Sequence, residues 1–459
     1  MPLVVAAVLG PVAVVAGLAA GAWAPMLLLA AATALAAWTL ADARATFVVA
    51  VLLATFVDYT TGRLTMEMAV VCVWLTWTAL VLFWRGAWNG AVLPRRAMTA
   101  GLAVWLGACM MGVVVGLLRG HDLRNLGIEL AAALWPALGL GIIQVFDRRS
   151  LVYAGATLLG VGLIHTAFGL TMLQVHQRRL GGIYFTTVTG IAALLLWTAA
   201  LLSPSRKVRA WCLVGMIPLL VHLLFSFTRG YWLGFIAGFA VATYLAWRSL
   251  SCFEPAERWR RLRVLPALAA VLAATLGFSM LFFGGGDLLD ALGGRFSSSF
   301  STEVSGATLS NLVRLDEYDR AIGAALESPV LGQGLGYSFI TKDLLLGTVR
   351  DQWFVHNYYL LIWLKLGIVG LAAFAFLLGT SVRAAKRVCD EDPDWRARAW
   401  AIGAIAVTVQ VLAILATNYS LADLTTAFVF AFVWGVFWSI RPESGSGEAA
   451  TRVAAPEGV

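Results

Sequence analysis

The feature that most constrains this chain is a series of long, continuous apolar stretches separated by short polar breaks. A bilayer core needs roughly 20 apolar residues for each spanning helix, and stretches of this kind recur along the sequence. They are rich in Ala, Leu, Val and Gly, without the apolar–polar alternation of membrane β-barrel strands. Only 13% of the residues are charged, about half the usual fraction in soluble domains. The sequence therefore predicts an all-α polytopic membrane protein.

We expect about 14 transmembrane helices, with a lower bound of about 12 because the first two segments could form a re-entrant pair and the third is short. The first stretch follows no basic region and precedes no evident cleavage site, so we expect a retained helix rather than a signal peptide. The candidate spans are 3–20, 25–41, 45–58, 66–84, 98–118, 126–146, 150–174, 182–202, 208–226, 230–247, 264–283, 356–382, 399–417 and 423–440.

The basic residues indicate the orientation. With the N-terminus in the cytoplasm, about two thirds of the 33 Lys and Arg residues fall on the cytoplasmic side, in agreement with the positive-inside rule. The net charge of +8 is then a topology signal, and the basic cluster at 258–263 is interpreted as an anchor at anionic lipid headgroups rather than a nucleic-acid site. Both termini are expected in the cytoplasm, with a disordered tail at 441–459.

One connection is much longer than the others, at residues 284–355 on the predicted outer side of the membrane. It contains a glycine triplet, a Ser-rich patch at 297–305, and apolar residues at near-helical spacing in 311–328. Pro329 follows. The spacing predicts an amphipathic helix that lies on the membrane surface or across the end of the bundle. Long insertions in short-looped proteins are often functional, so this loop marks the expected working face.

His356 directly follows the long loop and begins a predicted span, in the order His-Asn-Tyr-Tyr. A histidine at this position can accept a proton near neutral pH, and Asn357 beside it is a secondary candidate for the same site. The alternative for His356 is an interfacial residue next to two tyrosines, as in the aromatic belts of membrane proteins.

Arginines on the outer side run against the positive-inside trend, so their presence there requires a reason. Arg229 lies in a very short break between two spans, where an arginine normally has an anionic partner or faces a polar cavity. Arg179 and Arg314 also lie on the predicted outer side. The planar guanidinium binds phosphate oxygens in a bidentate manner, so a pyrophosphate-bearing lipid would explain all three. The alternative for Arg229 is an arginine that snorkels to the interface.

Other ionisable residues lie in or near predicted spans. Glu67, Glu129, His165 and His222 are interpreted as structural residues in helix packing, although charged groups within membranes are often functional. The role of Lys365 is left open.

Several kinds of site are not supported by the sequence. The Gly-Gln-Gly-Leu-Gly segment at 332–336 follows a predicted helix, whereas a dinucleotide fingerprint follows a strand. No nucleophile elbow of a hydrolase is present, and no ligand spacing predicts a metal or a cofactor. No disulfide is expected, because no cysteine falls in a segment predicted outside the cytoplasm. The five cysteines are Cys72, Cys109, Cys212, Cys252 and Cys389.

Four stretches occur in one order and on one side of the membrane. They are 179–182 (Arg-Leu-Gly-Gly); 226–230 (Ser-Phe-Thr-Arg-Gly); Arg314 with 328–336 (Ser-Pro-Val-Leu-Gly-Gln-Gly-Leu-Gly); and His356 and Asn357 with Gly367 and Gly370. In this combination the chain resembles the O-antigen ligase and O-antigen polymerase family of bacterial membrane glycosyltransferases, over roughly 179–374. The Pro-Asn pair that members often carry after the first stretch is absent here.

The resemblance implies an enzyme that moves a glycan from an undecaprenyl-diphosphate carrier to an acceptor glycan or glycolipid at the outer face of the membrane. It also implies a membrane fold of the glycosyltransferase C type, with no catalytic metal and no nucleotide sugar. We expect N-terminal helices at 1–174 and a catalytic region at 175–440. Whether the acceptor makes the enzyme a ligase or a polymerase stays open.

The residues suit such a reaction. His356 would act as general base, with Asp316 and Asp319 in reserve, while Arg229 together with Arg179 or Arg314 would hold the pyrophosphate. The competing class is a transporter or flippase of lipid-linked glycans, although the two halves show no clear internal repeat of the kind common in transporters. A glycan polymerase of the shape-and-division type is a third possibility, but its motifs are not found in the sequence.

Overall fold

The computed structural model describes residues 42, 44–45, 96–176, 186–226, 228–250, 261, 263–283, 306–343, 348–422 and 424–440. The chain divides into two compact units, Met1–Val92 and Leu93–Val459, and nearly all described residues belong to the second. The first four predicted spans and the predicted tail lie almost entirely outside the described residues.

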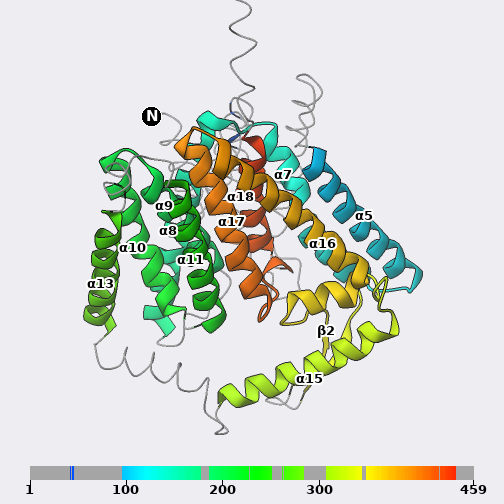
Figure 1. Cartoon of the computed structure of the whole chain (residues 1–459). Coiled ribbons are helices and arrows are strands. Elements are labelled where there is room, and N and C mark those ends of the chain that lie inside the picture. Colours follow the sequence, from blue (N-terminus) through cyan, green and yellow to red (C-terminus); the bar gives the residue numbers. More distant parts are fainter. Residues whose placement is uncertain are drawn as a thin grey trace, which may run out of the picture. The chain divides into compact units, whose positions relative to one another are not determined.

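The second unit is a bundle of long apolar helices (Figure 1). Its helices are α5 (Arg96–Leu118), α6 (Leu123–Ala133), α7 (Trp135–Ile143), η2 (Arg148–Ser150), α8 (Leu151–His176), α9 (Thr186–Leu202), α10 (Arg206–Phe225), α11 (Arg229–Leu250), α13 (Val264–Phe283), α15 (Gly306–Glu327), α16 (Tyr358–Glu391), α17 (Trp395–Leu415), η4 (Ser420–Ala422) and α18 (Leu424–Ser439). Among the described helices, six are long and apolar enough to cross a membrane, or seven if α6 and α7, bent by 43°, form one span. The helical membrane class is confirmed, and the total of about 14 spans remains a prediction.

The helices pack in pairs that are distant in sequence: α11 lies along α17, α5 along α16, and α7 along α18. Small residues allow the closest approaches. A Cβ added to Gly238 of α11 would lie 2.7 Å from the carbonyl oxygen of Ala406 in α17. Lipid tails are as apolar as leucine, so helices in a membrane associate through close van der Waals packing rather than through the hydrophobic effect. This close packing fixes the positions of the helices whose ends carry the candidate site residues.

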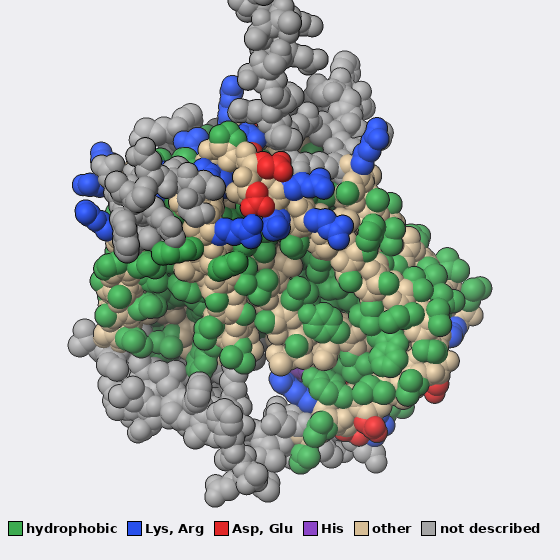
Figure 2. Space-filling model, viewed as in Figure 1, with side chains coloured by type: hydrophobic (Ala, Val, Ile, Leu, Met, Phe, Trp, Pro, Cys, Tyr) green, Lys and Arg blue, Asp and Glu red, His purple; other side chains and the backbone are tan. Residues whose placement is uncertain are grey.

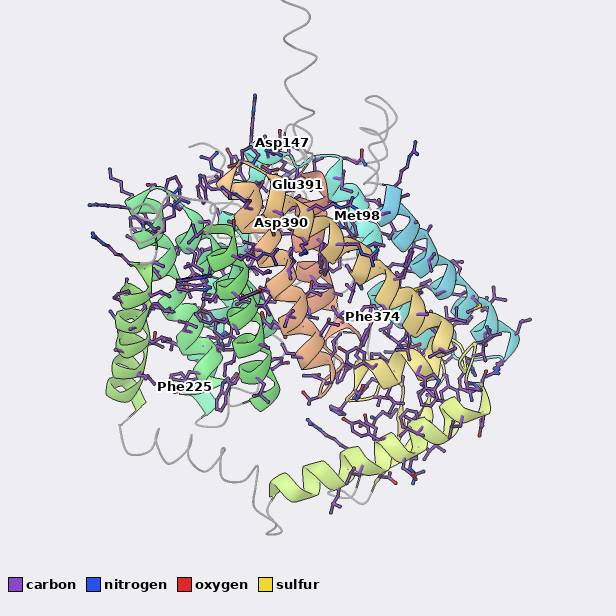
Figure 3. The ribbon with its side chains drawn as sticks, in the orientation of Figure 1. Met98, Asp147, Phe225, Phe374, Asp390 and Glu391 are labelled. Atoms are coloured by element: carbon purple, nitrogen blue, oxygen red, sulfur yellow. The ribbon has the colours of Figure 1, made fainter. Side chains whose placement is uncertain are left out.

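Charge is distributed unevenly between the two ends of this unit. The described Lys and Arg side chains gather mainly at the end opposite α15 (Figure 2). Asp147, Asp390 and Glu391 lie at the same basic end (Figure 3), where Arg148 forms an ion pair with Asp392. The two ends are therefore chemically different, with α15 covering the less basic one.

The predicted amphipathic helix is present as α15, which begins five residues earlier than expected and ends one residue before the end of the predicted segment. The strands β1 (Phe339–Asp343) and β2 (Thr348–Gln352) were not predicted, and they pair as an antiparallel ladder. The signal for β1 is a short alternation in which Phe339 and Thr341 are buried while Ile340 is 61% exposed. This period of two is typical of a half-buried strand.

Helix α16 is broken at Gly367, whose φ of 66° lies in the left-handed region. The segment 329–336 docks into this break. Pro329 and its neighbours supply backbone partners for both sides: Ile368 N donates to Pro329 O at 3.0 Å, and Gln333 N donates to Leu364 O at 2.7 Å. A side chain at Gly367 would meet the carbonyl of Val330 at 2.0 Å. The glycines therefore serve close backbone packing, and the rejection of a dinucleotide loop agrees with this structure.

Candidate active site

His356 lies between the end of β2 and the start of α16, at the same end of the bundle as α15. Asn357, the next residue, is the N-cap of α16: its Oδ1 accepts a hydrogen bond from Leu360 N at 3.1 Å. Its Nδ2 donates to the carbonyl of Ala416 at 3.2 Å. Asn357 therefore fixes the helix start and its contact with the end of α17, and this places His356 where the two helices meet.

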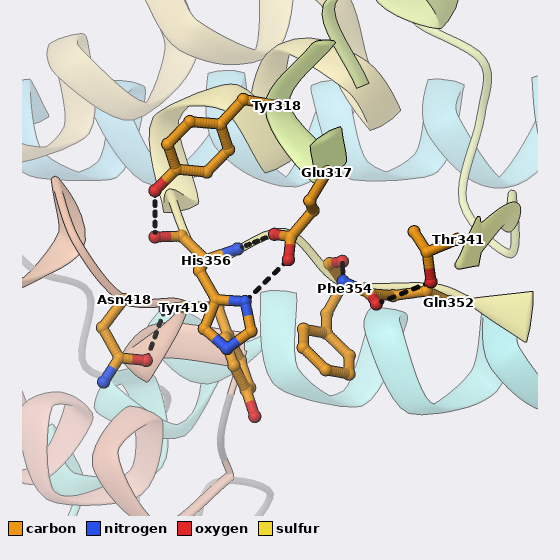
Figure 4. A network of polar contacts seen from close by, with 8 residues as sticks. All are labelled: Glu317, Tyr318, Thr341, Gln352, Phe354, His356, Asn418 and Tyr419. Atoms are coloured by element: carbon orange, nitrogen blue, oxygen red, sulfur yellow. Dashed lines mark hydrogen bonds and ion pairs between the residues drawn. The ribbon is translucent and has the colours of Figure 1, made fainter. Parts of the chain in front are cut away.

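The closest charged partner of His356 is Glu317 of α15 (Figure 4). Glu317 Oε2 lies 2.8 Å from the imidazole Nδ1, and its other oxygen, Oε1, accepts a short hydrogen bond from the backbone N–H of His356. One carboxylate thus holds both the main chain and the ring. The Glu317 side chain is only 2% exposed, whereas the His356 side chain is 30% exposed.

This geometry determines the tautomer of the imidazole. An ionised carboxylate only accepts hydrogen bonds, so the nitrogen that faces it carries the proton. With Nδ1 protonated, Nε2 of the neutral ring has its lone pair available. No residue that the structure describes forms a hydrogen bond with Nε2. The arrangement suits a base that is oriented by a buried carboxylate and opens toward a substrate.

Tyr318 and Arg314 extend the site along α15. The Tyr318 hydroxyl donates to the backbone carbonyl of His356 at 3.1 Å. Burial raises the pKa of the Tyr318 phenol above its usual value, the nearby Arg314 guanidinium opposes this rise, and the Glu317 carboxylate adds to it. Arg314, predicted as a phosphate ligand, therefore lies near Tyr318, the residue that follows Glu317.

Aromatic rings enclose the imidazole. The centroids of Phe354 and Tyr419 each lie 5.4 Å from that of His356, in edge-to-face geometry. The segment before His356 is anchored by Gln352, whose Nε2 donates to Phe354 O at 2.9 Å and whose Oε1 accepts from the Thr341 hydroxyl at 3.2 Å. The β-hairpin thereby fixes the chain that leads to the histidine.

Arg229 is the first residue of α11, and its side chain lies outside the described residues. The backbone at this point faces the turn at 416–419: a Cβ on Gly230 would lie 2.5 Å from Thr417 Oγ1. Two residues after Arg229, the Tyr231 hydroxyl accepts a hydrogen bond from Asn418 Nδ2 at 3.0 Å. The same turn contacts Asn357 and His356, so the structure brings the start of α11 to the start of α16.

The other predicted residues are placed differently. Asp316 forms a 2.9 Å ion pair with Arg320 on the outer side of α15, and Asp319 is exposed. The structure places neither next to His356; the acidic residue of α15 that contacts His356 is Glu317. Arg179 lies outside the described residues.

The sequence contained a signal for Glu317 that the prediction missed. On a helical projection Glu317 shares its face with Ala321, Ala324 and Ala325, which are all buried. A carboxylate on the apolar face of an amphipathic helix has to find a partner. Asp316 and Asp319, the reserve candidates for the base, lie on the charged faces of α15.

A second acid–base pair lies deeper in the bundle. Lys365 of α16 contacts a carboxylate oxygen of Glu129 in α6 and also donates to the carbonyl of Tyr337. The other Glu129 oxygen accepts from Gly336 N at 2.7 Å. Both charged side chains are nearly inaccessible, with 3% and 6% exposure. The pair anchors the end of the docked 329–336 segment, which gives Lys365 a structural role and agrees with the structural interpretation of Glu129.

Further titratable groups lie away from this site. His165 and His222 are buried in α8 and α10. Within the part of the chain that the structure describes, no group of three or more His, Cys, Asp or Glu side chains could hold a metal ion.

Comparison with known families identifies the segment that carries this site. Residues 214–375 match the family model described as O-Antigen ligase. The match includes Arg229, α15, Glu317 and His356, and it ends before the turn that carries Tyr419. No curated protein matches the chain.

Proposed function

Because residues 214–375 carry the domain of the O-antigen ligase family, a family of membrane enzymes of the glycosyltransferase type, we propose that this protein transfers a glycan from an undecaprenyl-diphosphate carrier. The acceptor is a hydroxyl of a lipid-linked core sugar or of another repeat unit, at the outer face of the bacterial inner membrane. The proposal includes a membrane fold of the glycosyltransferase C type.

The observation that carries the proposal is the Glu317–His356 pair at the start of α16. Glycosyl transfer to a hydroxyl requires a base for the hydroxyl proton, and an oriented neutral histidine supplies one. Buried Glu317 holds the ring through Nδ1 and stabilises the imidazolium that forms when Nε2 takes the proton. The partial exposure of His356 leaves room for the acceptor to approach.

The leaving pyrophosphate needs positive charge beside this base. Helices α11 and α16 both begin at the turn 416–419, and the N-terminal end of a helix favours anions. Arg229 is the first residue of α11, and Arg314 lies near Tyr318. We assign pyrophosphate binding to these two arginines, with Arg179 as a further candidate.

The reaction is then a direct displacement. The acceptor oxygen forms a bond with the anomeric carbon while the bond from that carbon to the carrier phosphate oxygen breaks. The hydroxyl proton passes to His356 Nε2, and the carrier leaves as undecaprenyl diphosphate with the electron pair. A single displacement inverts the anomeric configuration. No metal is required to balance this step.

The charge distribution supports the proposed orientation. The basic end of the second unit corresponds to the cytoplasmic side by the positive-inside rule, so the end covered by α15 faces outward. In this orientation α15 covers the site at the level of the carrier headgroup and positions both substrates. The carrier's pyrophosphate would reach the site from the outer leaflet.

The test uses purified protein in lipid vesicles that contain an undecaprenyl-diphosphate-linked glycan and an acceptor glycolipid, both extracted from the source bacterium. We expect a new glycosidic linkage with wild-type protein. His356→Ala should lower its rate by about 100- to 10,000-fold, while an equal amount of folded protein is recovered. Movement of the glycan lipid between leaflets without a new linkage would assign the protein to the transporter class instead, and near-normal transfer by His356→Ala would remove the general base.

A further inference from the structure

Three aromatic side chains form a continuous cluster beside the proposed base. The rings of Phe354 and Tyr419 lie 4.4 Å apart, inclined by 33°, in a nearly stacked arrangement. Trp353 contacts Phe354 edge-to-face at 5.4 Å. The imidazole of His356 stands across the Phe354–Tyr419 stack at 72° and 80°.

This cluster differs from the aromatic packing of the bundle. Trp197, Trp434 and Phe430 are fully or almost fully buried, as expected for packing residues. Trp353, Phe354 and Tyr419 are each partly exposed, as is His356. Partly exposed aromatic rings beside a reactive group are typical of a ligand-binding wall.

The surrounding hydrogen bonds hold two of the rings in place. The backbone of Phe354 is bound by Gln352, which is itself 8% exposed. Tyr419 N donates to Asn418 Oδ1 at 2.7 Å, and Asn418 Nδ2 donates to Tyr231, which is 2% exposed. Both rings are therefore presented from rigid, buried supports, which reduces the entropy that a ligand loses in ordering them.

Pyranose sugars match such a wall. One face of a pyranose ring presents several C–H groups with small positive partial charges, and the face of an aromatic ring is negative. A sugar can therefore stack on an aromatic ring while its hydroxyl groups remain hydrogen-bonded elsewhere. A pyrophosphate gains nothing from the negative face of an aromatic ring, so the cluster does not suit the carrier headgroup.

We propose that Trp353, Phe354 and Tyr419 form the binding platform for the acceptor sugar, an inference that rests on the function proposed above. The platform contacts the imidazole that takes the proton, so the sugar stacked on it would place a hydroxyl at His356 Nε2. Arg229 and the two helix starts remain for the donor. Tyr419 lies outside the segment that matches the family, so acceptor choice depends partly on a residue beyond that segment.

The experiment measures initial transfer rates in vesicles with the donor and acceptor lipids described above, varying one substrate while the other is saturating. The variants are Phe354→Leu and Tyr419→Leu, which remove a ring, and Tyr419→Phe, which retains it. Phe376→Leu is the matched control, because Phe376 of α16 is 46% exposed and does not belong to the cluster.

We expect each ring-removing variant to raise the KM for the acceptor about three- to tenfold, the range that corresponds to the loss of one aromatic contact. The KM for the donor and the acid limb of the pH–rate profile should stay unchanged. Tyr419→Phe, which retains the ring, should leave the acceptor KM at the wild-type value. A lower kcat with an unchanged acceptor KM, or a shifted acid limb, would show that the rings only orient His356 and would overturn the platform.

A measurement on the wild-type protein keeps the test decisive if the variants do not accumulate. Methyl β-galactopyranoside should inhibit transfer in competition with the acceptor, whereas sorbitol, which has hydroxyl groups but no ring, should not. Equal inhibition by the two compounds, or by neither, overturns the platform. Failure of the wild-type protein to form any glycosidic product would instead overturn the function on which the platform rests.

Discussion

Two acid–base pairs involve helix α16 or the residues just before it, and they differ in how far their side chains are exposed to solvent. The Glu317–His356 pair joins α15 to the residue before the α16 N-cap, and the His356 side chain is 30% exposed. The Glu129–Lys365 pair joins α6 to the interior of α16, and both side chains are at most 6% exposed. Each carboxylate also accepts a backbone N–H, from His356 and from Gly336 respectively.

The two pairs differ in how the basic side chain uses its nitrogen atoms in hydrogen bonds. Lys365 donates to Glu129 and to the carbonyl of Tyr337, and a small, mainly apolar cavity borders it. The Lys365 charge therefore holds the docked segment 329–336 in place. His356 uses only Nδ1 in its pair, and no residue that the structure describes forms a hydrogen bond with its second nitrogen. Similar pairs thus hold the architecture in one place and, under the proposed function, transfer a proton in the other.

The largest predicted effect on folding concerns the buried pair. Lys365→Met would leave the Glu129 carboxylate buried without its cation, and breaking a buried pair in this way costs about 3–5 kcal/mol. We expect a lower midpoint of thermal unfolding in detergent. The double variant Glu129→Gln with Lys365→Met should recover most of the loss, since no unpaired charge remains.

The comparison predicts that the Lys365→Met protein which does fold transfers glycan at close to the normal rate per molecule. The appropriate control is Lys386→Met, because Lys386 is 57% exposed and only loosely paired with Asp390. A large loss of transfer in well-folded Lys365→Met protein would contradict a purely architectural role and would bring Lys365 into the reaction.

A smaller effect is expected from Glu317→Gln. The amide retains a hydrogen bond to the ring but lacks the charge that stabilises the imidazolium, so we expect kcat to fall about 10- to 100-fold. A kcat equal to that of the wild type would reject Glu317 as the electrostatic partner.

The smallest effect is expected one residue away. Asp316 is also acidic and also paired, but its ion pair with Arg320 is more than one third exposed on both sides, and exposed pairs contribute little. Asp316→Asn should keep the transfer rate within about twofold of wild type in the same assay. A loss comparable to that of Glu317→Gln would show that Asp316, rather than Glu317, serves the site.

Prediction from the sequence worked for features whose pattern lies within a single segment of the chain. Continuous apolar stretches located the six or seven candidate spans that the structure describes, and near-helical spacing located α15. His356 and Arg229 were selected as candidates because each lies at the boundary of a span, where a polar residue stands out against the apolar background, and their roles stay predictions. The β-hairpin was missed because each strand is only five residues long and its alternation is brief.

The long loop before His356 was predicted from the sequence alone, because a bilayer leaves few ways to solvate apolar helices and a long polar insertion has to lie outside. The partner of His356 was decided only by the tertiary structure. Glu317 and His356 are far apart along the chain, and only the docking of α15 over the start of α16 brings the carboxylate to within 2.8 Å of the imidazole. The same docking exposes Asp316 and buries Glu317, since neighbouring positions on a helix face different directions. A sequence shows which residues can carry charge, whereas packing decides which of them are buried away from water and therefore have to pair with one another.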